Sequence, residues 1–287
     1  MSGQKVAVVT GANKGLGFAI VRGLCKNFEG DVILTARDEG RGKAAVAELE
    51  KEELHPKFHQ LDISDHESVL RIKDFLEKNY GGIDILVNNA AIAYEFNSVL
   101  SPPIGQAAEE VCKINYFGTL DVCQELFPLL RPHARVCNVS SINCEFSLSE
   151  YSDELKAKVR KTDLTIDDIT ALVKQFVDAA NKNQLKEQGF DSSPYGISKV
   201  GVSLMTILQQ KELDAKGAED IVVNACDVGL VATDMTGGAG MPIDQGATTP
   251  LYCCLLPPDI ESPRGKFIMN KRVYDWLTAC TTEATAS

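Results

Sequence analysis

The stretch from residue 5 to residue 17 constrains this chain more than any other part of the sequence. Val6–Val9 is a short apolar run, typical of a strand buried on both faces of a parallel sheet. Gly11, Gly15 and Gly17 follow, and a helical pattern of apolar side chains begins directly after them. Glycines permit a tight turn and a close backbone approach, and the first turn of a helix offers unpaired N–H groups. This order of strand, glycine turn and helix predicts a site for the phosphates of a dinucleotide.

Strand patterns and helical patterns alternate through most of the chain. The strand patterns are short runs at residues 6–9, 31–36, 57–62, 83–87, 135–139, 221–225 and 266–269. Helical patterns lie between them, and one long helical pattern covers residues 104–127. Such alternation produces a parallel sheet, because each helix returns the chain to the same end of the sheet. The sequence therefore predicts an α/β fold of the Rossmann type, with a doubly wound parallel sheet of about seven strands and helices on both faces.

Residues 145–190 interrupt this alternation. They hold two charged helical patterns, near residues 151–161 and 165–187, with no strand pattern between them. We expect a helical insertion that lies over the sheet, within a single domain of residues 1–278. The remaining residues, 279–287, are small and polar, and we expect a disordered tail there.

Composition and charge exclude several classes of protein. The 287 residues carry a formal net charge of −11, which disfavours nucleic acid and anionic membranes as partners. No apolar run approaches the roughly 18 residues that cross a bilayer, and the N-terminus lacks the order of a signal peptide, so we expect a cytoplasmic protein. The nine cysteines have no paired spacing, and the four histidines have no spacing typical of metal ligands. These features predict reduced thiols and no metal site.

Basic residues near the first glycine turn indicate which dinucleotide binds. A NAD-binding site of this kind carries an acidic residue about 20 positions after the glycines. Arg37 stands at that distance from Gly17, and an arginine pairs with a 2′-phosphate rather than with ribose hydroxyls. Lys14 adds positive charge in the turn itself, so we expect NADPH rather than NADH. Asp62, at the end of the third strand pattern, is expected to bind the adenine amino group.

Tyr195 and Lys199 are four residues apart at the start of a helical pattern, so both side chains lie on one face of a helix. A tyrosine hydroxyl ordinarily has a pKa of about 10. A nearby ammonium lowers that pKa, because it favours the phenolate. A tyrosine tuned in this way can give a proton to a carbonyl oxygen, or take one back from an alcohol.

Together these motifs resemble the short-chain dehydrogenase/reductase family, and within it the monomeric NADPH-dependent carbonyl reductases. The resemblance spans most of the chain, in the family's order. It rests on Thr10-Gly-Ala-Asn-Lys-Gly-Leu-Gly17, Leu34-Thr-Ala-Arg37, Asn88-Asn-Ala-Ala91, Asn115, Asn138-Val-Ser-Ser141, Tyr195-Gly-Ile-Ser-Lys199 and Thr233-Asp-Met235.

The resemblance implies a role for each catalytic residue. Ser141 is implied to hydrogen-bond the carbonyl oxygen of the substrate, and Tyr195 to protonate it. Lys199 is implied to hold the nicotinamide ribose and to lower the pKa of Tyr195, and Asn115 to hold a water that links Lys199 to solvent. Two hydroxyl donors stabilise the negative charge that builds on the oxygen as the cofactor delivers a hydride.

The resemblance also implies a cofactor site, a substrate pocket and an oligomeric state. The residues implied to bind NADPH are Gly11, Asn13, Lys14, Gly15, Leu16, Gly17, Arg37, Asp62, Ile63, Asn88, Ala90, Tyr195, Lys199, Val228, Gly229, Val231 and Thr233. The residues implied to line the substrate pocket are Ser141, Ile142, Tyr195 and Leu230. The insertion resembles a helical cover over the interface helices of oligomeric relatives, which implies a monomer.

The sequence departs from the family pattern after the sixth strand pattern. The family has Pro-Gly there, whereas this chain reads Cys226-Asp-Val-Gly-Leu230. Asp227 is expected either to repel acidic substrates or to face solvent. Leu230 replaces a bulky aromatic residue and Ala232 replaces a basic one, which predicts a roomier and more aliphatic pocket.

The predicted function is NADPH-dependent reduction of aldehydes, ketones or quinones to alcohols by hydride transfer, with Tyr195 as the proton donor. One alternative is an NADP-dependent alcohol dehydrogenase that works in the oxidative direction with the same residues. The other is a non-catalytic NADP(H)-sensing protein. The altered loop after residue 226 favours the sensor, and the four intact catalytic residues disfavour it.

Overall fold

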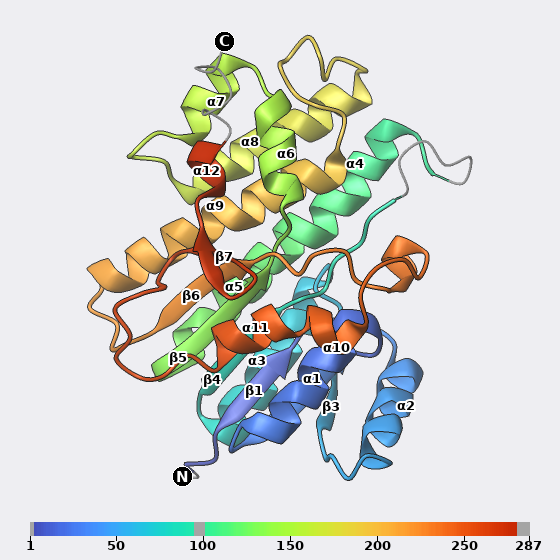
Figure 1. Ribbon diagram of the computed structural model, residues 1–287, viewed down its shortest axis with the longest axis vertical. Coiled ribbons are helices and arrows are strands. Elements are labelled where there is room, and N and C mark those ends of the chain that lie inside the picture. The colour runs from blue at the N-terminus through green and yellow to red at the C-terminus, as the bar shows by residue number, and fades with distance from the viewer. Residues whose placement is uncertain (1–2, 95–100, 280–287) are drawn as a thin grey trace.

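A central sheet of eight strands organises the protein (Figure 1). The computed structural model describes residues 3–94 and 101–279. Its strands are β1 (Val6–Val9), β2 (Asp31–Ala36), β3 (Lys57–Gln60), β4 (Ile83–Asn88), β5 (Leu130–Val139), β6 (Val222–Cys226), β7 (Phe267–Met269) and β8 (Arg272–Tyr274). They lie in the order β3-β2-β1-β4-β5-β6-β7-β8, and every neighbouring pair except β7 and β8 is parallel. The predicted doubly wound parallel sheet is confirmed.

The eighth strand is missing from the sequence-based prediction of seven. β8 pairs antiparallel with β7 through a turn at Asn270 and Lys271, both of which have positive φ. Two consecutive residues with positive φ form the tight hairpin turn that matches the twist of the strands. Sequence patterns identify such turns by an Asn-Gly or Asp-Gly pair, and here a lysine occupies the second position.

Helices connect the strands and extend beyond the sheet. They are α1 (Gly15–Asn27), α2 (Glu39–Glu50), α3 (His66–Tyr80), α4 (Ile104–Cys112), α5 (Thr119–Leu126), α6 (Asn143–Glu150), α7 (Asp153–Val159), α8 (Ile166–Asn181), α9 (Pro194–Ala215), α10 (Ile243–Gly246), α11 (Thr248–Cys254) and α12 (Trp276–Ala279). A π-helical turn covers Lys113–Gly118, and short 3₁₀ turns cover Phe127–Leu129 and Asp234–Thr236.

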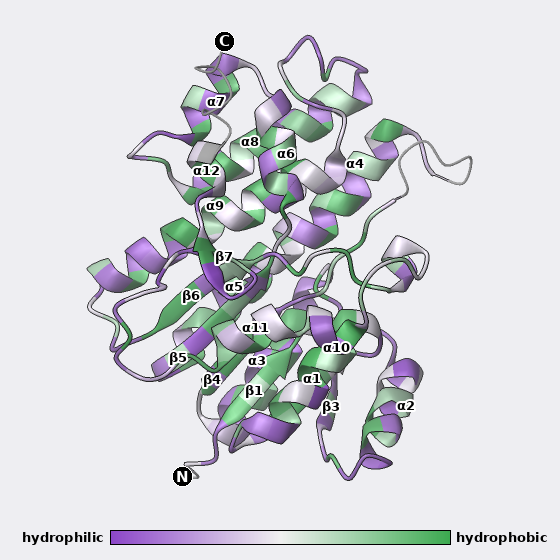
Figure 2. Ribbon diagram, in the orientation of Figure 1, coloured by the Kyte–Doolittle hydropathy of each residue, from purple (hydrophilic) through white to green (hydrophobic). Residues whose placement is uncertain are grey.

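The two faces of the sheet are both covered, and β1 shows how the sequence achieves this. Ala7 and Val9 point to one face, where they join a core with residues of α1, α2 and α11. Val6 and Val8 point to the other face and join a core with residues of α3 and α5. All four side chains are fully buried, and Figure 2 shows the central strands as hydrophobic. A run of apolar residues without polar alternation is therefore what a strand in this position requires.

The long helix predicted at residues 104–127 is interrupted in its middle. α4 ends at Cys112, one π-helical turn follows, and α5 begins at Thr119. Asn115 lies in this turn, and its amide bonds the backbone of Ile92, accepting from the N–H at 2.8 Å and donating to the carbonyl at 2.9 Å. The prediction of one continuous helix is wrong here, since periodicity does not reveal a single wider turn.

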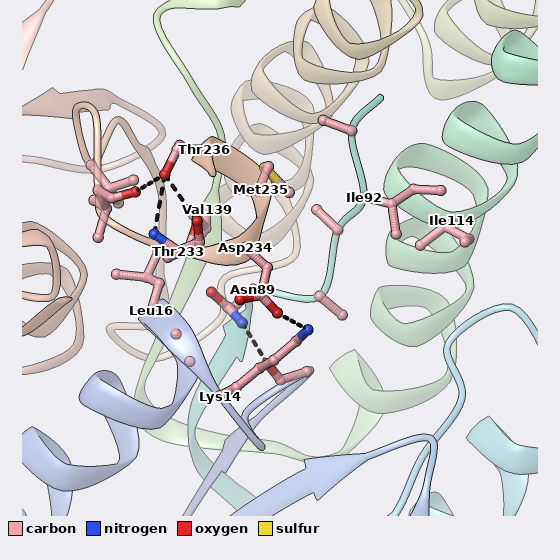
Figure 3. Close-up of a pocket in the computed structure, with 18 of the residues that line it drawn as sticks. Lys14, Leu16, Asn89, Ile92, Ile114, Val139, Thr233, Asp234, Met235 and Thr236 are labelled. Carbon is pink, nitrogen blue, oxygen red and sulfur yellow. Dashed lines mark hydrogen bonds and ion pairs between the residues drawn. The ribbon is translucent and has the colours of Figure 1, made fainter. Parts of the chain in front are cut away.

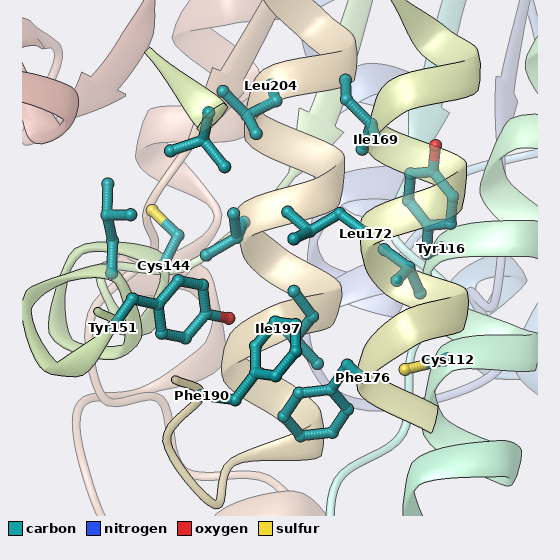
Figure 4. Packing of buried hydrophobic residues seen from close by; sticks show 14 of the residues in the cluster. Cys112, Tyr116, Cys144, Tyr151, Ile169, Leu172, Phe176, Phe190, Ile197 and Leu204 are labelled. Carbon is teal, nitrogen blue, oxygen red and sulfur yellow. The ribbon is translucent and has the colours of Figure 1, made fainter. Parts of the chain in front are cut away.

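The insertion is helical, as predicted, and contains α6, α7 and α8. The sequence patterns predict the two later helices but not α6. Phe190 contacts the rings of Tyr151 and Phe176 edge-on, with centroids 5.4 Å apart in each pair (Figure 4). The same core includes Phe267 of β7 and Trp276 of α12. Because the insertion shares its core with the sheet, we propose that the described residues form one domain.

The eight described cysteines are all free thiols, as predicted, and seven of them are buried. The thiols of Cys137, Cys226 and Cys253 lie within 4.8 Å of one another in the apolar core beside β5, β6 and α11. We assign no ion to this group, which does not line the cleft described below.

Within the described ranges, no helix is both long enough and apolar enough to cross a bilayer. The predicted disordered tail lies outside the described residues from residue 280 onward.

Candidate active site

A cleft of about 900 Å³ opens at the carboxyl ends of the central strands. The strand order reverses between β1 and β4, which is where doubly wound sheets bind their ligands. The predicted site residues that line the cleft are Gly11, Asn13, Lys14, Gly15, Leu16, Gly17, Arg37, Asp62, Ile63, Ala90, Ser141, Tyr195, Lys199, Val228, Gly229, Leu230, Val231 and Thr233. Three predicted residues do not line it, namely Asn88, Asn115 and Ile142.

The glycine turn packs directly against the segment that follows β4. Gly11 has a φ of +63°, and a Cβ placed on it lies 2.8 Å from the Cα of Ala90. A Cβ placed on Gly17 lies 2.6 Å from the Nδ2 of Asn89, so neither position has room for a side chain. The Thr10 hydroxyl accepts hydrogen bonds from the N–H groups of Asn89 (2.9 Å) and Ala90 (3.0 Å). These contacts fix the start of α1 at the cleft, where its free N–H groups can bind an anion.

Asn88 lies beneath the cleft, contrary to the prediction. Its Nδ2 donates to the Oδ1 of Asn138 at 2.8 Å, and the side chain is buried. Asn89 lines the cleft instead, with its Nδ2 donating to the carbonyls of Thr10 (2.9 Å) and Gly11 (3.0 Å) (Figure 3). Successive side chains at a strand end point to opposite sides, and the pair Asn-Asn does not reveal which one faces the ligand.

Three cations line the cleft near the glycine turn and the end of β2. Lys14 forms an ion pair with Asp234 in the loop after β6 (Figure 3), and the Arg41 guanidinium lies 3.5 Å from the carboxylate of Asp38. Across residues 3–94 and 101–279, no carboxylate forms an ion pair with Arg37. Arg37 therefore offers uncompensated positive charge to an anionic ligand.

Tyr195 lies in the first turn of α9, next to Ser141. The helix begins there because the Ser193 hydroxyl accepts the N–H of Gly196 at 2.9 Å. Burial raises the pKa of Tyr195 to about 12, while a hydrogen bond with Ser141 lowers it and the charge of Asp227 raises it. The predicted lowering of this pKa is not found, because desolvation disfavours the phenolate more than the neighbouring groups favour it. At neutral pH the hydroxyl therefore carries its proton.

Lys199 follows Tyr195 by one helical turn and is only 3% exposed. Its ammonium donates to the carbonyl of Val139 at 2.8 Å and lies 5.4 Å from the centre of the Tyr195 ring. Burial lowers the pKa of Lys199 to about 8, since desolvation disfavours the charged form. The side chain is still mostly an ammonium at neutral pH, held between the end of β5 and Tyr195.

Two buried polar residues lie behind these side chains. Asn115 donates to the Ser198 hydroxyl at 3.1 Å, in addition to its bonds with the Ile92 backbone. Its amide is thus used within the protein, and its role in a water link to Lys199 remains a prediction. Ser140 is 2.7 Å from the Ser203 hydroxyl and faces α9, which leaves Ser141 as the serine with its hydroxyl at Tyr195.

Asp227 is buried at 7% exposure, so the expectation that it faces solvent is wrong. Its Oδ1 accepts the N–H of Ile142 at 2.8 Å, and its Oδ2 accepts the N–H of Gly229 at 2.9 Å. Ile142 was predicted to line the substrate pocket, but it does not line the cleft, whereas the next residue, Asn143, does. Instead, the backbone N–H of Ile142 donates a hydrogen bond to the Asp227 carboxylate.

The cleft carries apolar side chains at its rim. Leu230 is 60% exposed, and Met235 and Tyr94 are further large apolar residues that line the cleft and remain exposed. Ala232 also lines it, as expected from the family pattern. Tyr94 was not among the predicted site residues, because a single exposed aromatic residue has no periodic pattern that would distinguish it.

The lowered pKa of Lys199 predicts a specific pH dependence of stability. In the folded protein the amine releases its proton near pH 8, whereas the ordinary pKa of lysine is 10.5. Above about pH 8 the unfolded state therefore binds more protons, so the free energy of unfolding rises with pH. We expect the wild type to gain roughly 2 kcal/mol between about pH 8 and about pH 9.5 relative to Lys199→Met, measured by urea unfolding. An identical pH dependence in both proteins would contradict the buried ammonium.

Comparison with known proteins agrees with this geometry. The family model for short chain dehydrogenase matches residues 5–153. The chain is 47% identical to carbonyl reductase [NADPH] 1 of Oryctolagus cuniculus over 277 residues, covering 96% of this chain and 99% of the relative. It is 48% identical to carbonyl reductase [NADPH] 1 of Homo sapiens over 278 residues, with the same coverage. Among solved structures, salutaridine reductase from Papaver somniferum matches with a TM-score of 0.82 at 30% identity, covering 92% of this chain and 99% of that one. This chain belongs to the short-chain dehydrogenase family.

Proposed function

We propose that this protein reduces carbonyl compounds (aldehydes, ketones or quinones) to alcohols with NADPH. The observation that carries the proposal is the meeting of Ser141, Tyr195 and Lys199 at the inner end of one cleft. Near-full-length similarity to proteins named as NADPH-dependent carbonyl reductases supports the same reaction and cofactor. We also propose a cytoplasmic location, which the free thiols of the described cysteines support.

The residues of the cleft fit NADPH at both ends. Gly15, Leu16 and Gly17 line the cleft, so the start of α1 offers its unpaired N–H groups to the phosphates. Arg37 has no carboxylate partner among the described residues and would hold the 2′-phosphate. Asp62 would bind the adenine amino group, and Lys199 the ribose next to the nicotinamide. When bound, NADPH supplies the hydride.

The protein's own contribution to the reaction is to place two hydroxyl donors at the substrate oxygen. Negative charge develops on that oxygen during reduction, and fixed donors in a dry site stabilise it. Tyr195 holds a proton at neutral pH because burial raises its pKa to about 12, so it is ready to donate. The Ser141 hydroxyl is the second donor. The Lys199 ammonium lies beside the Tyr195 ring and stabilises the phenolate that forms when Tyr195 donates its proton.

The same pKa bears on the two alternative functions. Alcohol oxidation requires the phenolate of Tyr195, which is scarce at neutral pH when the pKa is about 12. The protonated tyrosine is the form that reduction uses. A sensor without turnover has no use for a buried ammonium next to a tyrosine, since burying that charge costs stability.

We expect Tyr195→Phe to lower kcat for NADPH oxidation by about 100- to 10,000-fold while leaving NADPH affinity nearly unchanged, since only the proton donor is removed. Absorbance of reduced nicotinamide with quinones, aromatic aldehydes and aliphatic ketones measures the rate. Tyr80→Phe is the matched control, because that hydroxyl bonds Asp31 outside the cleft. A wild type that binds NADPH tightly but oxidises none of it across the panel would support the sensor instead.

Arg37→Ala tests the choice of cofactor. The variant loses the pairing with the 2′-phosphate, so we expect the dissociation constant for NADPH to rise about 10- to 100-fold and that for NADH to change less than about twofold. Fluorescence titration of each nucleotide measures both constants. Arg71→Ala removes an arginine outside the cleft and serves as the control. Equal weakening of NADPH and NADH would contradict a 2′-phosphate site at Arg37.

We further propose that the protein is a monomer. α8 packs against α4 and α9, so the insertion covers these helices within one chain. Light scattering of the purified protein should give the mass of a single chain, 31.2 kDa. A stable dimer or tetramer across the tested concentrations would contradict the proposal.

A further inference from the structure

The Asp227 carboxylate joins two segments that reach the cleft from neighbouring strands. The last backbone hydrogen bond between β5 and β6 runs from the N–H of Ser140 to the carbonyl of Cys226 at 2.9 Å. Beyond it the backbones separate to form the two walls of the cleft. At this point Asp227 accepts the N–H of Ile142 on one side and the N–H of Gly229 on the other.

Each of these N–H groups belongs to a segment that the reaction uses. Ile142 directly follows Ser141, whose hydroxyl lowers the pKa of Tyr195. Gly229, with a φ of +71°, is the second residue of the loop that lines the cleft from Val228 to Thr236. The Asp227 carboxylate is therefore the side chain that joins the Ser141 segment to the loop, one step beyond the backbone bond of Ser140.

We propose that Asp227 is a positioning residue for carbonyl reduction: its carboxylate holds the Ser141 segment to the Gly229 loop, so that the Ser141 and Tyr195 hydroxyls meet one substrate oxygen. This inference rests on the proposed function. Of the two earlier expectations for Asp227, burial rules out a carboxylate that faces solvent, whereas repulsion of acidic substrates stays a prediction.

The chemistry of the site requires a carboxylate rather than an amide. Two N–H groups arrive from opposite sides, and a carboxylate accepts with both oxygens. Hydrogen bonds to an ionised acceptor are also stronger than neutral ones. In Asp227→Asn one oxygen becomes an NH₂ group, which opposes one of the two N–H donors and separates the segments.

A second effect of Asp227 distinguishes it from a residue that is only structural. The titratable or charged groups that face Tyr195 are Cys144, Lys199 and Asp227 itself, with the Ser141 hydroxyl beside them. The negative charge of Asp227 raises the pKa of Tyr195 and so favours its proton-donating form. Removing the charge should move the ionisation of Tyr195 to lower pH.

The test measures kcat for NADPH-dependent reduction in four proteins: wild type, Asp227→Asn, Ser141→Ala and the double variant. If Asp227 acts through Ser141, Asp227→Asn should lower kcat at least about tenfold in the wild type but less than about twofold when Ser141 is already alanine. The rates are compared at saturating NADPH, because the loop that Asp227 holds includes Val228 and Gly229, which were predicted to bind the cofactor. Equal losses in both backgrounds, or no loss in the wild type, would overturn the proposal.

The second readout is the pH profile of alcohol oxidation, whose acid limb reports the ionisation of Tyr195. We expect this limb to move to lower pH in Asp227→Asn, and an unmoved limb would contradict the electrostatic part. Should Asp227→Asn fail to fold, Asp227→Glu carries the test. Asp227→Glu keeps the negative charge, so the pH profile should not move. Because the longer side chain displaces the carboxylate oxygens, Asp227→Glu should lower kcat when Ser141 is intact and leave kcat unchanged when Ser141 is already alanine.

Asp84→Asn is the matched control for a general loss of stability. Asp84 also accepts a backbone N–H, that of Val6 at 2.7 Å, and lies at the opposite end of the sheet. It should lower the free energy of unfolding without changing kcat per folded molecule. If the wild type itself fails to oxidise NADPH, the proposed function fails. If the wild type turns over and Asp227→Asn equals it, only this inference fails.

Discussion

The hydrogen bond from the Lys199 ammonium to the Val139 carbonyl is the contact on which the proposed active site most depends. It joins α9 to the carboxyl end of β5 inside the protein, at 2.8 Å. Because Tyr195 precedes Lys199 by one helical turn, the same contact sets Tyr195 beside Ser141, which follows that strand. Burying an ammonium costs free energy, which is expressed in the lowered pKa of Lys199. The result is a positive charge next to Tyr195, the proposed proton donor.

Charge is distributed unequally along the cleft, and the two ends serve different purposes. At the end near the glycine turn, Arg37 is exposed and without a carboxylate partner among the described residues, as a site for a phosphate requires. At the end near Tyr195, Lys199 and Asp227 are both buried, and their charges act on the Tyr195 hydroxyl in opposite directions. The ammonium favours the phenolate, and the carboxylate favours the protonated phenol. Together with desolvation, these two charges leave Tyr195 protonated at neutral pH, so that it can donate its proton to a substrate oxygen.

Local patterns in the sequence were sufficient for the fold and for most of the cleft. Gly11 and Gly17 could be identified because a strand precedes them and a helix follows, and Tyr195 and Lys199 because of their helical spacing. Three features could not be identified from the sequence, because each depends on geometry that leaves no periodic signal. They are the choice between Asn88 and Asn89, the π turn at Asn115 and the short strand β8. The desolvation of Tyr195 and the burial of Asp227 arise from tertiary packing. Sequence reasoning therefore gave the wrong direction for the pKa of Tyr195 and missed the partners of Asp227.

The central claim is that the cleft transfers a hydride from NADPH to a carbonyl carbon while Tyr195 protonates the oxygen. The most direct measurement uses NADPH deuterated at the transferable position, with a ketone as substrate and mass analysis of the product. The account predicts an alcohol that carries the deuterium on its carbinol carbon, formed by the wild type and not by Tyr195→Phe. An alcohol without deuterium, or none at all from a wild type that binds NADPH, would contradict it.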